Sequence, residues 1–118
     1  MSDAGPRLLI VDDDGGHRKM LEAVVRERVG AIATAASAED ALELLGGDLP
    51  DLVLLDMRMP GMGGMGFLRA LKERGISLPV VVVTAFAEVE DAVEAMKLGA
   101  VDYLSKPIDL AMLEEILE

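Results

Sequence analysis

The stretch Leu8-Leu9-Ile10-Val11-Asp12-Asp13-Asp14 sets a continuous apolar run directly against three acidic residues. Four consecutive apolar side chains are expected for a strand that is buried on both faces, as in a parallel sheet covered by helices. The acids then fall at the carboxyl end of that strand, where open parallel sheets gather their ligands. This stretch therefore predicts both a fold class and the position of a functional site.

The same alternation of short apolar runs and amphipathic stretches continues along the chain. Further strands are predicted at residues 31–35, 52–55, 80–83 and 101–104. Helices are predicted at residues 18–29, 38–45, about 65–74, from 89 until Gly99 ends it, and 108–118. Regular strand–helix alternation predicts one α/β domain over residues 1–118, with a parallel sheet and helices on both faces.

The composition excludes several classes of function. The 118 residues include 11 Lys and Arg against 22 Asp and Glu, a formal net charge of −11, so nucleic-acid backbones and anionic membrane surfaces should repel the chain. The absence of Cys and the single His exclude disulfides, thiolate catalysis and multi-histidine metal sites. That histidine, His17, is expected to be solvated or to face a partner. With no membrane-length apolar run or signal pattern, a soluble, cytoplasmic protein is expected.

Polar side chains follow four of the predicted strands. Asp12 and Asp13 follow the first strand, Asp56 the third, Thr84 the fourth and Lys106 the fifth. Because the carboxyl ends of parallel strands share one edge, these side chains should form a single site. Its oxygen-rich ligands suit Mg²⁺, although the acids after the first strand also suit plain helix capping.

Asp56 ends a wholly apolar strand, where a buried carboxylate needs a partner. Carboxylates can be nucleophiles that form acyl phosphates, and a divalent ion beside Asp56 would offset charge in the transition state. Lys106 could pair with the phosphoryl group, and the Thr84 hydroxyl could donate to another of its oxygens. Considered alone, Lys106 would be interpreted as a surface lysine and Thr84 as a β-branched strand residue. Their predicted position at the same edge of the sheet favours the functional interpretation.

Four segments together resemble the receiver domain of bacterial two-component response regulators: LIVDDD at 9–14, LLDMRMPG at 54–61, VTA at 83–85 and GAVDYLSKP at 99–107. The resemblance implies a flavodoxin-like (CheY-like), doubly wound, five-stranded parallel sheet of order 2-1-3-4-5. It implies a phosphorylatable switch rather than an enzyme acting on a metabolite, at the N-terminal end of a longer regulator. The implied partners are a sensor histidine kinase and an effector domain of transcriptional type, and a homodimer on phosphorylation is a further expectation.

The resemblance also assigns roles to the acids. It implies that Asp56 is the phosphoacceptor. Mg²⁺ would be bound directly by Asp13, by Asp56 and by the backbone carbonyl of Arg58, and through water by Asp12.

The same resemblance implies a switch. Thr84 and Lys106 would sense the phosphoryl group, and Tyr103 matches the aromatic position that turns inward when the hydroxyl moves. The Lys106–Pro107 peptide resembles the family's cis bond. The helix from Val89 and the final helix would carry the output surface.

Three alternatives compete with this hypothesis. Gly61, Gly63 and Gly66 form a G-x-G-x-x-G string, which is typical of dinucleotide binding but lacks the expected acid about 20 residues later. An aspartyl-nucleophile phosphatase shares a strand-end Asp, but those enzymes resemble D-x-D and here the second position is Arg58. A non-phosphorylated interaction module with the same fold would not need the complete set of acid, hydroxyl and lysine.

Overall fold

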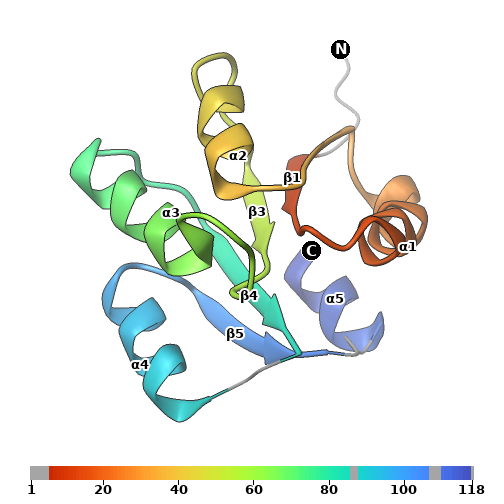
Figure 1. Ribbon diagram of the computed structural model, residues 1–118. Coiled ribbons are helices and arrows are strands. Elements are labelled where there is room, and N and C mark those ends of the chain that lie inside the picture. Colours follow the sequence, from red (N-terminus) through yellow and green to blue (C-terminus); the bar gives the residue numbers. More distant parts are fainter. Residues whose placement is uncertain (1–5, 86–87, 107–109, 118) are drawn as a thin grey trace.

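Five parallel strands form the centre of the molecule in the computed structural model, which describes residues 6–85, 88–106 and 110–117 (Figure 1). They are β1 (Arg7–Val11), β2 (Ala31–Ala35), β3 (Leu52–Leu55), β4 (Val80–Thr84) and β5 (Asp102–Ser105). The strand order is β2-β1-β3-β4-β5, so the predicted doubly wound sheet is confirmed.

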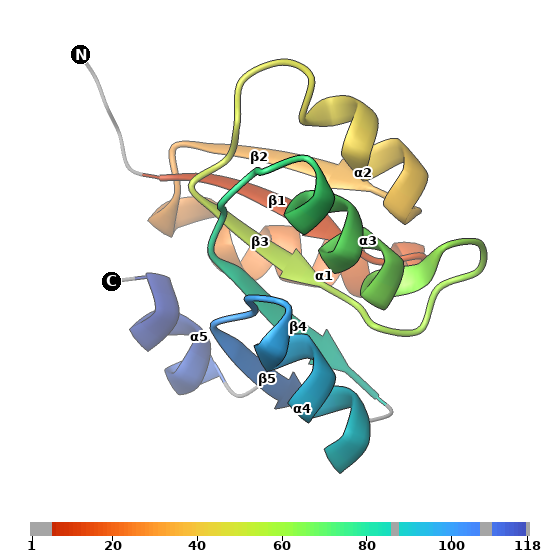
Figure 2. The same ribbon diagram turned by 90° about the vertical axis from the view of Figure 1, so that its left-hand side faces the viewer.

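Helices cover both faces of this sheet, as Figures 1 and 2 show. One face is covered by α1 (Gly15–Val25) and α5 (Leu110–Leu117), and the other by α2 (Ala38–Leu44), α3 (Gly63–Glu73) and α4 (Val89–Lys97). A 3₁₀ turn, η1 (Arg26–Arg28), follows α1. Within the described ranges, no helix has the length and hydropathy needed to cross a membrane.

The side chains of β1 divide between two apolar layers. Leu9 and Val11 belong to the layer that contains Phe67 of α3, whereas Leu8 and Ile10 belong to the layer that contains Leu21 of α1. Successive strand residues point to opposite faces, so a strand covered on both sides has no position left for a polar side chain. Burying each such side chain contributes about 1.5–3 kcal/mol, which explains why the polar groups begin only where the strand ends.

Helix boundaries differ from the predicted ones where local caps decide them. The first helix begins at Gly15 rather than at residue 18, because the side chain of Asp14 accepts the N–H of His17 at 3.2 Å; such an N-cap contributes about 1 kcal/mol. It gives way to the 3₁₀ turn after Val25 instead of continuing to residue 29. The final helix is described from Leu110 to Leu117; residues 108, 109 and 118 of its predicted range lie outside the described residues.

Candidate functional site

Pairing between β1 and β3 brings the first acids together. The register pairs Val11 with Leu55, and the N–H of Asp56 donates to the Val11 carbonyl at 2.8 Å, so Asp12 and Asp56 leave the sheet side by side. Carboxylate oxygens of Asp12, Asp13 and Asp56 all lie within 4.8 Å of one another. Asp12 and Asp56 are buried and Asp13 is exposed, so the cluster opens to solvent on one side.

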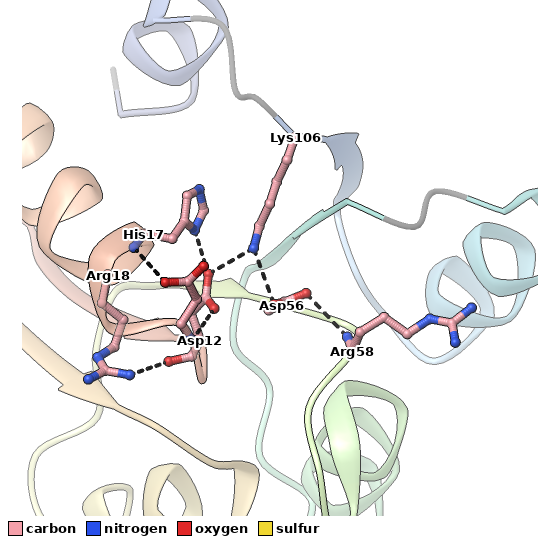
Figure 3. Close-up of polar contacts among 7 residues, drawn as sticks. Asp12, His17, Arg18, Asp56, Arg58 and Lys106 are labelled. Atoms are coloured by element: carbon pink, nitrogen blue, oxygen red, sulfur yellow. Dashed lines mark hydrogen bonds and ion pairs between the residues drawn. The ribbon is translucent and has the colours of Figure 1, made fainter.

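Lys106 supplies a cation to this cluster from the other half of the sheet. Its N–H donates to the carbonyl of Thr84 at 2.8 Å, which extends the β4–β5 pairing by one residue. Its Nζ lies 3.1 Å from Asp12 Oδ2 and 3.3 Å from Asp56 Oδ2, and Figure 3 shows the lysine reaching between the two carboxylates. One ammonium group is thus shared by two buried acids.

The two buried acids differ in protonation energetics. Burial raises the pKa of Asp56, and repulsion from Asp12 adds to this; the hydrogen bond from the Arg58 N–H and the attraction of Lys106 do not offset them. Burial also opposes ionisation of Asp12, but hydrogen bonds from the Asp14 N–H, His17 and Lys106 lower its pKa overall. Asp12 is therefore the firmly charged member of the pair, and Asp56 carries a charge that the site compensates only in part.

The same two carboxylates also shift the pKa of Lys106. Burial lowers the pKa of its ammonium group, but the hydrogen bond and charge of Asp12, together with those of Asp56, raise it overall. The lysine is therefore held in its charged form at neutral pH.

The loop after β3 fixes the orientation of Asp56. The N–H of Arg58 donates to Asp56 Oδ1 at 3.2 Å. The side chain of Arg58 points away from the carboxylates (Figure 3) and contacts Glu88 at 3.1 Å and Asp91 at 3.9 Å. Because the guanidinium is directed elsewhere, only the backbone of Arg58 faces the acid cluster.

Thr84 and Tyr103 lie on the neighbouring strands β4 and β5. Thr84 ends β4 and is completely buried. Tyr103 is half-buried and packs against the layer of α2, α3 and α4; its hydroxyl oxygen is buried without a hydrogen-bond partner in the described part of the chain. Burial raises the pKa of this phenol. The predicted cis bond involves Pro107, which lies outside the described residues.

His17 is the residue that the sequence interpretation missed. The prediction of a solvated or partner-facing histidine is wrong, because the side chain is only 12% exposed and its Nδ1 lies 2.5 Å from Asp12 Oδ2. The Asp14 cap starts α1 at Gly15 and so puts His17 in the first turn of the helix. The sequence signal for this contact is Asp14 as an N-cap, because a helix that starts directly after it puts His17 in the first turn.

The donor set fits a hard divalent ion. Oxygens of three carboxylates lie within 4.8 Å of one another. Mg²⁺ in proteins takes one or two carboxylates, completed by waters and phosphate oxygens, so the cluster offers enough carboxylates for direct ligation and a further one to orient water. Exposure of Asp13 leaves the cluster open to water.

The glycine string after Pro60 has a conformational explanation. Gly61 and Gly63 adopt φ values of +79° and +71°, which L side chains rarely adopt. A Cβ added to Gly64 would lie 2.6 Å from the Asp56 carbonyl oxygen, so α3 can approach the loop only with glycine at that position. These glycines follow β3 rather than the first strand of the sheet. Positive φ explains Gly61 and Gly63, and a Cβ added to Gly66 would lie 2.9 Å from Met62 Cβ.

Comparison with known proteins gives concordant matches. The family model of the response regulator receiver domain matches residues 8–118. The transcriptional regulatory protein ZraR of Salmonella typhimurium is 44% identical over 111 residues, which are 94% of this chain and 25% of that protein. The chain spans about a quarter of the length of the curated relatives it matches.

Solved structures agree with this family. The signal receiver domain of a putative LuxO repressor protein from Vibrio parahaemolyticus superposes with a TM-score of 0.89 at 28% identity, covering 95% of this chain and 86% of that one. The chemotaxis protein CheY4 of Vibrio cholerae has a TM-score of 0.87 at 27% identity, covering 97% of each chain.

Proposed function

This chain belongs to the response regulator receiver domain family of two-component signalling, and from that premise we propose that it is a switch phosphorylated on Asp56. The observation that carries the proposal is the position of Lys106 Nζ, 3.3 Å from Asp56 Oδ2 and 3.1 Å from Asp12 Oδ2. A buried carboxylate, a second acid and a shared cation thus meet at one edge of the sheet, an arrangement that suits the receipt of a phosphoryl group.

The proposed reaction is transfer from a phosphohistidine of a sensor kinase. A carboxylate oxygen of Asp56 attacks phosphorus, the O–P bond forms and the P–N bond breaks; the leaving imidazole keeps the electron pair and is protonated. Asp13, Asp56 and the Arg58 carbonyl would hold Mg²⁺ directly and Asp12 through water. When bound, the ion offsets charge on the phosphoryl oxygens.

In this proposal, Lys106 and Thr84 bind the phosphoryl group on Asp56. The phosphoryl group adds about two negative charges and strong acceptor oxygens, which attract the ammonium group away from Asp12. The Thr84 hydroxyl donates to another phosphoryl oxygen, and Tyr103 turns inward as the hydroxyl moves.

An exposed apolar surface on α4 supports an output role. Val89 is 80% exposed, Val93 49% and Met96 46%, and Val101 before β5 is 55% exposed. Exposed apolar patches mark interaction sites. We propose that an effector domain, attached or separate and of transcriptional type as in ZraR, or a second copy of the chain after phosphorylation, binds here. The domain catalyses only its own phosphorylation and dephosphorylation, and its cellular site is the cytoplasm, where its kinase presents phosphohistidine.

A phosphorylation assay tests the proposal. The protein is incubated with Mg²⁺ and acetyl phosphate, and phosphoryl incorporation is measured by intact mass. One acid-stable, base-labile phosphoryl group per chain is expected for the wild type and none for Asp56→Asn. Asp48→Asn is the matched control, since this exposed acid pairs with Arg7 at the opposite end of β1.

The same assay separates the alternatives. An aspartyl-nucleophile phosphatase would release phosphate over many cycles instead of retaining one group. An interaction module without phosphorylation would show no incorporation, and a dinucleotide-binding protein would be indifferent to the phosphodonor. Equal labelling of the wild type and Asp56→Asn would refute Asp56 as the acceptor.

A further inference from the structure

The Asp12 carboxylate accepts hydrogen bonds from three directions. Its Oδ1 accepts the N–H of Asp14 at 2.9 Å, and its Oδ2 faces both His17 Nδ1 at 2.5 Å and Lys106 Nζ at 3.1 Å. In addition, Arg18 donates to the Asp12 backbone carbonyl at 2.6 Å. Of these contacts, the lysine's is the only one that the proposed switch withdraws.

The side chain of His17 makes its hydrogen bond to Asp12 in a nearly closed environment. The side chains of His17 and Asp12 are 12% and 3% exposed, and His17 Nε2 is buried without a hydrogen-bond partner among the described residues. An ionised carboxylate only accepts hydrogen bonds, so Nδ1 is the donor in this contact. A histidine in the first turn of a helix could point into water; this one instead directs its bonded nitrogen at the acid (Figure 3).

We infer that His17 is a positioning residue, which holds the Asp12 carboxylate in its working orientation both before Lys106 moves to the phosphoryl group and afterwards. The inference rests on the proposed function. A buried carboxylate that lost its lysine without another side-chain donor would be left undersatisfied, which is costly. With His17 in place, Asp12 keeps one donor on each oxygen and remains available to orient water around the metal position. Partners of this outer kind typically change metal affinity by 10- to 100-fold.

Substitutions at residue 17 separate the hydrogen bond from the bulk of the ring. His17→Leu fills the space without a donor, whereas His17→Asn offers an amide N–H where Nδ1 stands. Lys19→Ala is the matched control, because this exposed residue lies on the same helix. Mg²⁺ binding to the unphosphorylated chain is measured by calorimetry. We expect about tenfold weaker binding for His17→Leu, with His17→Asn and Lys19→Ala close to wild type.

A double-mutant cycle provides a readout that does not depend on the metal. Urea unfolding in Mg²⁺-free buffer compares His17→Leu, Asp12→Asn and the double variant, and non-additive effects are expected for groups in direct contact. Additive effects, or unchanged or tighter Mg²⁺ binding by His17→Leu, would overturn the inference and leave the proposed function intact. Equal weakening by His17→Asn and His17→Leu would also overturn it, since the donor would then not matter. Wild-type protein that binds no Mg²⁺ would refute the proposed function and this inference together.

Discussion

The Arg58 guanidinium lies 3.1 Å from the carboxylate of Glu88, so the loop that follows Asp56 is joined to the start of α4. Arg58 also lies 3.9 Å from Asp91 in the first turn of that helix. A second ion pair, between Arg69 and Glu94, joins α3 to α4. The helix that carries the exposed apolar surface is therefore joined by surface charges to the loop that follows Asp56 and to α3.

These surface contacts should contribute little to stability individually. The side chains of Arg58 and Glu88 are 49% and 63% exposed, and exposed pairs contribute about 0.2–1 kcal/mol. We expect a coupling energy in that range from a cycle of Arg58→Ala and Glu88→Ala in urea unfolding. It should shrink as salt is raised, because salt screens exposed charges. No coupling at low salt would mean that the contact does not join the loop to the helix.

Asp56→Asn should make the unphosphorylated protein more stable in Mg²⁺-free buffer at neutral pH. Because burial raises the pKa of Asp56 on folding, ionising it at neutral pH costs the folded state free energy. At low pH Asp56 is protonated in the folded protein and this cost is absent. The cost appears as pH rises through the pKa of Asp56 in the folded state. The difference between Asp56→Asn and wild type should therefore vanish at acid pH. Urea unfolding across pH measures this; a less stable Asp56→Asn at pH 7 would contradict it.

Mg²⁺ should raise the unfolding temperature of the wild type but not of Asp13→Asn. A ligand that binds only the folded state stabilises it by about 2.7 kcal/mol at a hundred times its dissociation constant. Since Asp13 is exposed, Asp13→Asn should match the wild type in EDTA. Thermal unfolding with and without Mg²⁺ checks both statements, with Asp51→Asn as a control that keeps the metal response. An equal response in Asp13→Asn would exclude Asp13 as a ligand.

Gly64→Ala should destabilise the fold by about 1–3 kcal/mol, as forced overpacking does. The added Cβ would lie 2.6 Å from the Asp56 carbonyl oxygen and 2.8 Å from Met57 Cα, and backbone atoms cannot rotate out of the way. Gly47→Ala is the control, because its Cβ would meet its nearest atom, the Leu44 carbonyl oxygen, at 3.8 Å. Urea unfolding measures both variants; equal stability of the two would show that α3 moves away at no cost.

Strands and their ends could be predicted from the sequence because burial on both faces leaves an unbroken apolar signal. Leu52–Leu55 and Ala31–Ala35 match the predicted ranges, and β5 is displaced by one residue, to Asp102–Ser105. Starts of helices were harder to predict. The third helix begins at Gly63 rather than near residue 65, because tertiary contact with the Asp56 loop overrides the poor helix propensity of its first two glycines. The strand order came from the family resemblance and not from the periodicity.

The candidate site could be predicted as a set of strand ends but not as a network of contacts. Parallel strands put Asp12, Asp56 and Lys106 at one edge whatever their side chains do, so topology alone brings them together. The contact of His17 depends on where α1 begins, and a shift of three residues in that start changes which way the ring points. Similarly, the sequence carries no sign that one oxygen of Asp12 serves both a histidine and a lysine.

The strand order puts Asp12 and Asp56 at the ends of central strands and Lys106 after an edge strand. β1 and β3, which end at Asp12 and Asp56, are hydrogen-bonded to neighbours on both sides, whereas β5, which leads to Lys106, is bonded on one side only. A strand at the margin of a sheet can shift with the loss of fewer ladder bonds than one in the middle. If Asp56 is phosphorylated as proposed, the added charge therefore arrives at the well-bonded centre of the sheet, whereas Lys106 follows an edge strand that can shift at lower cost.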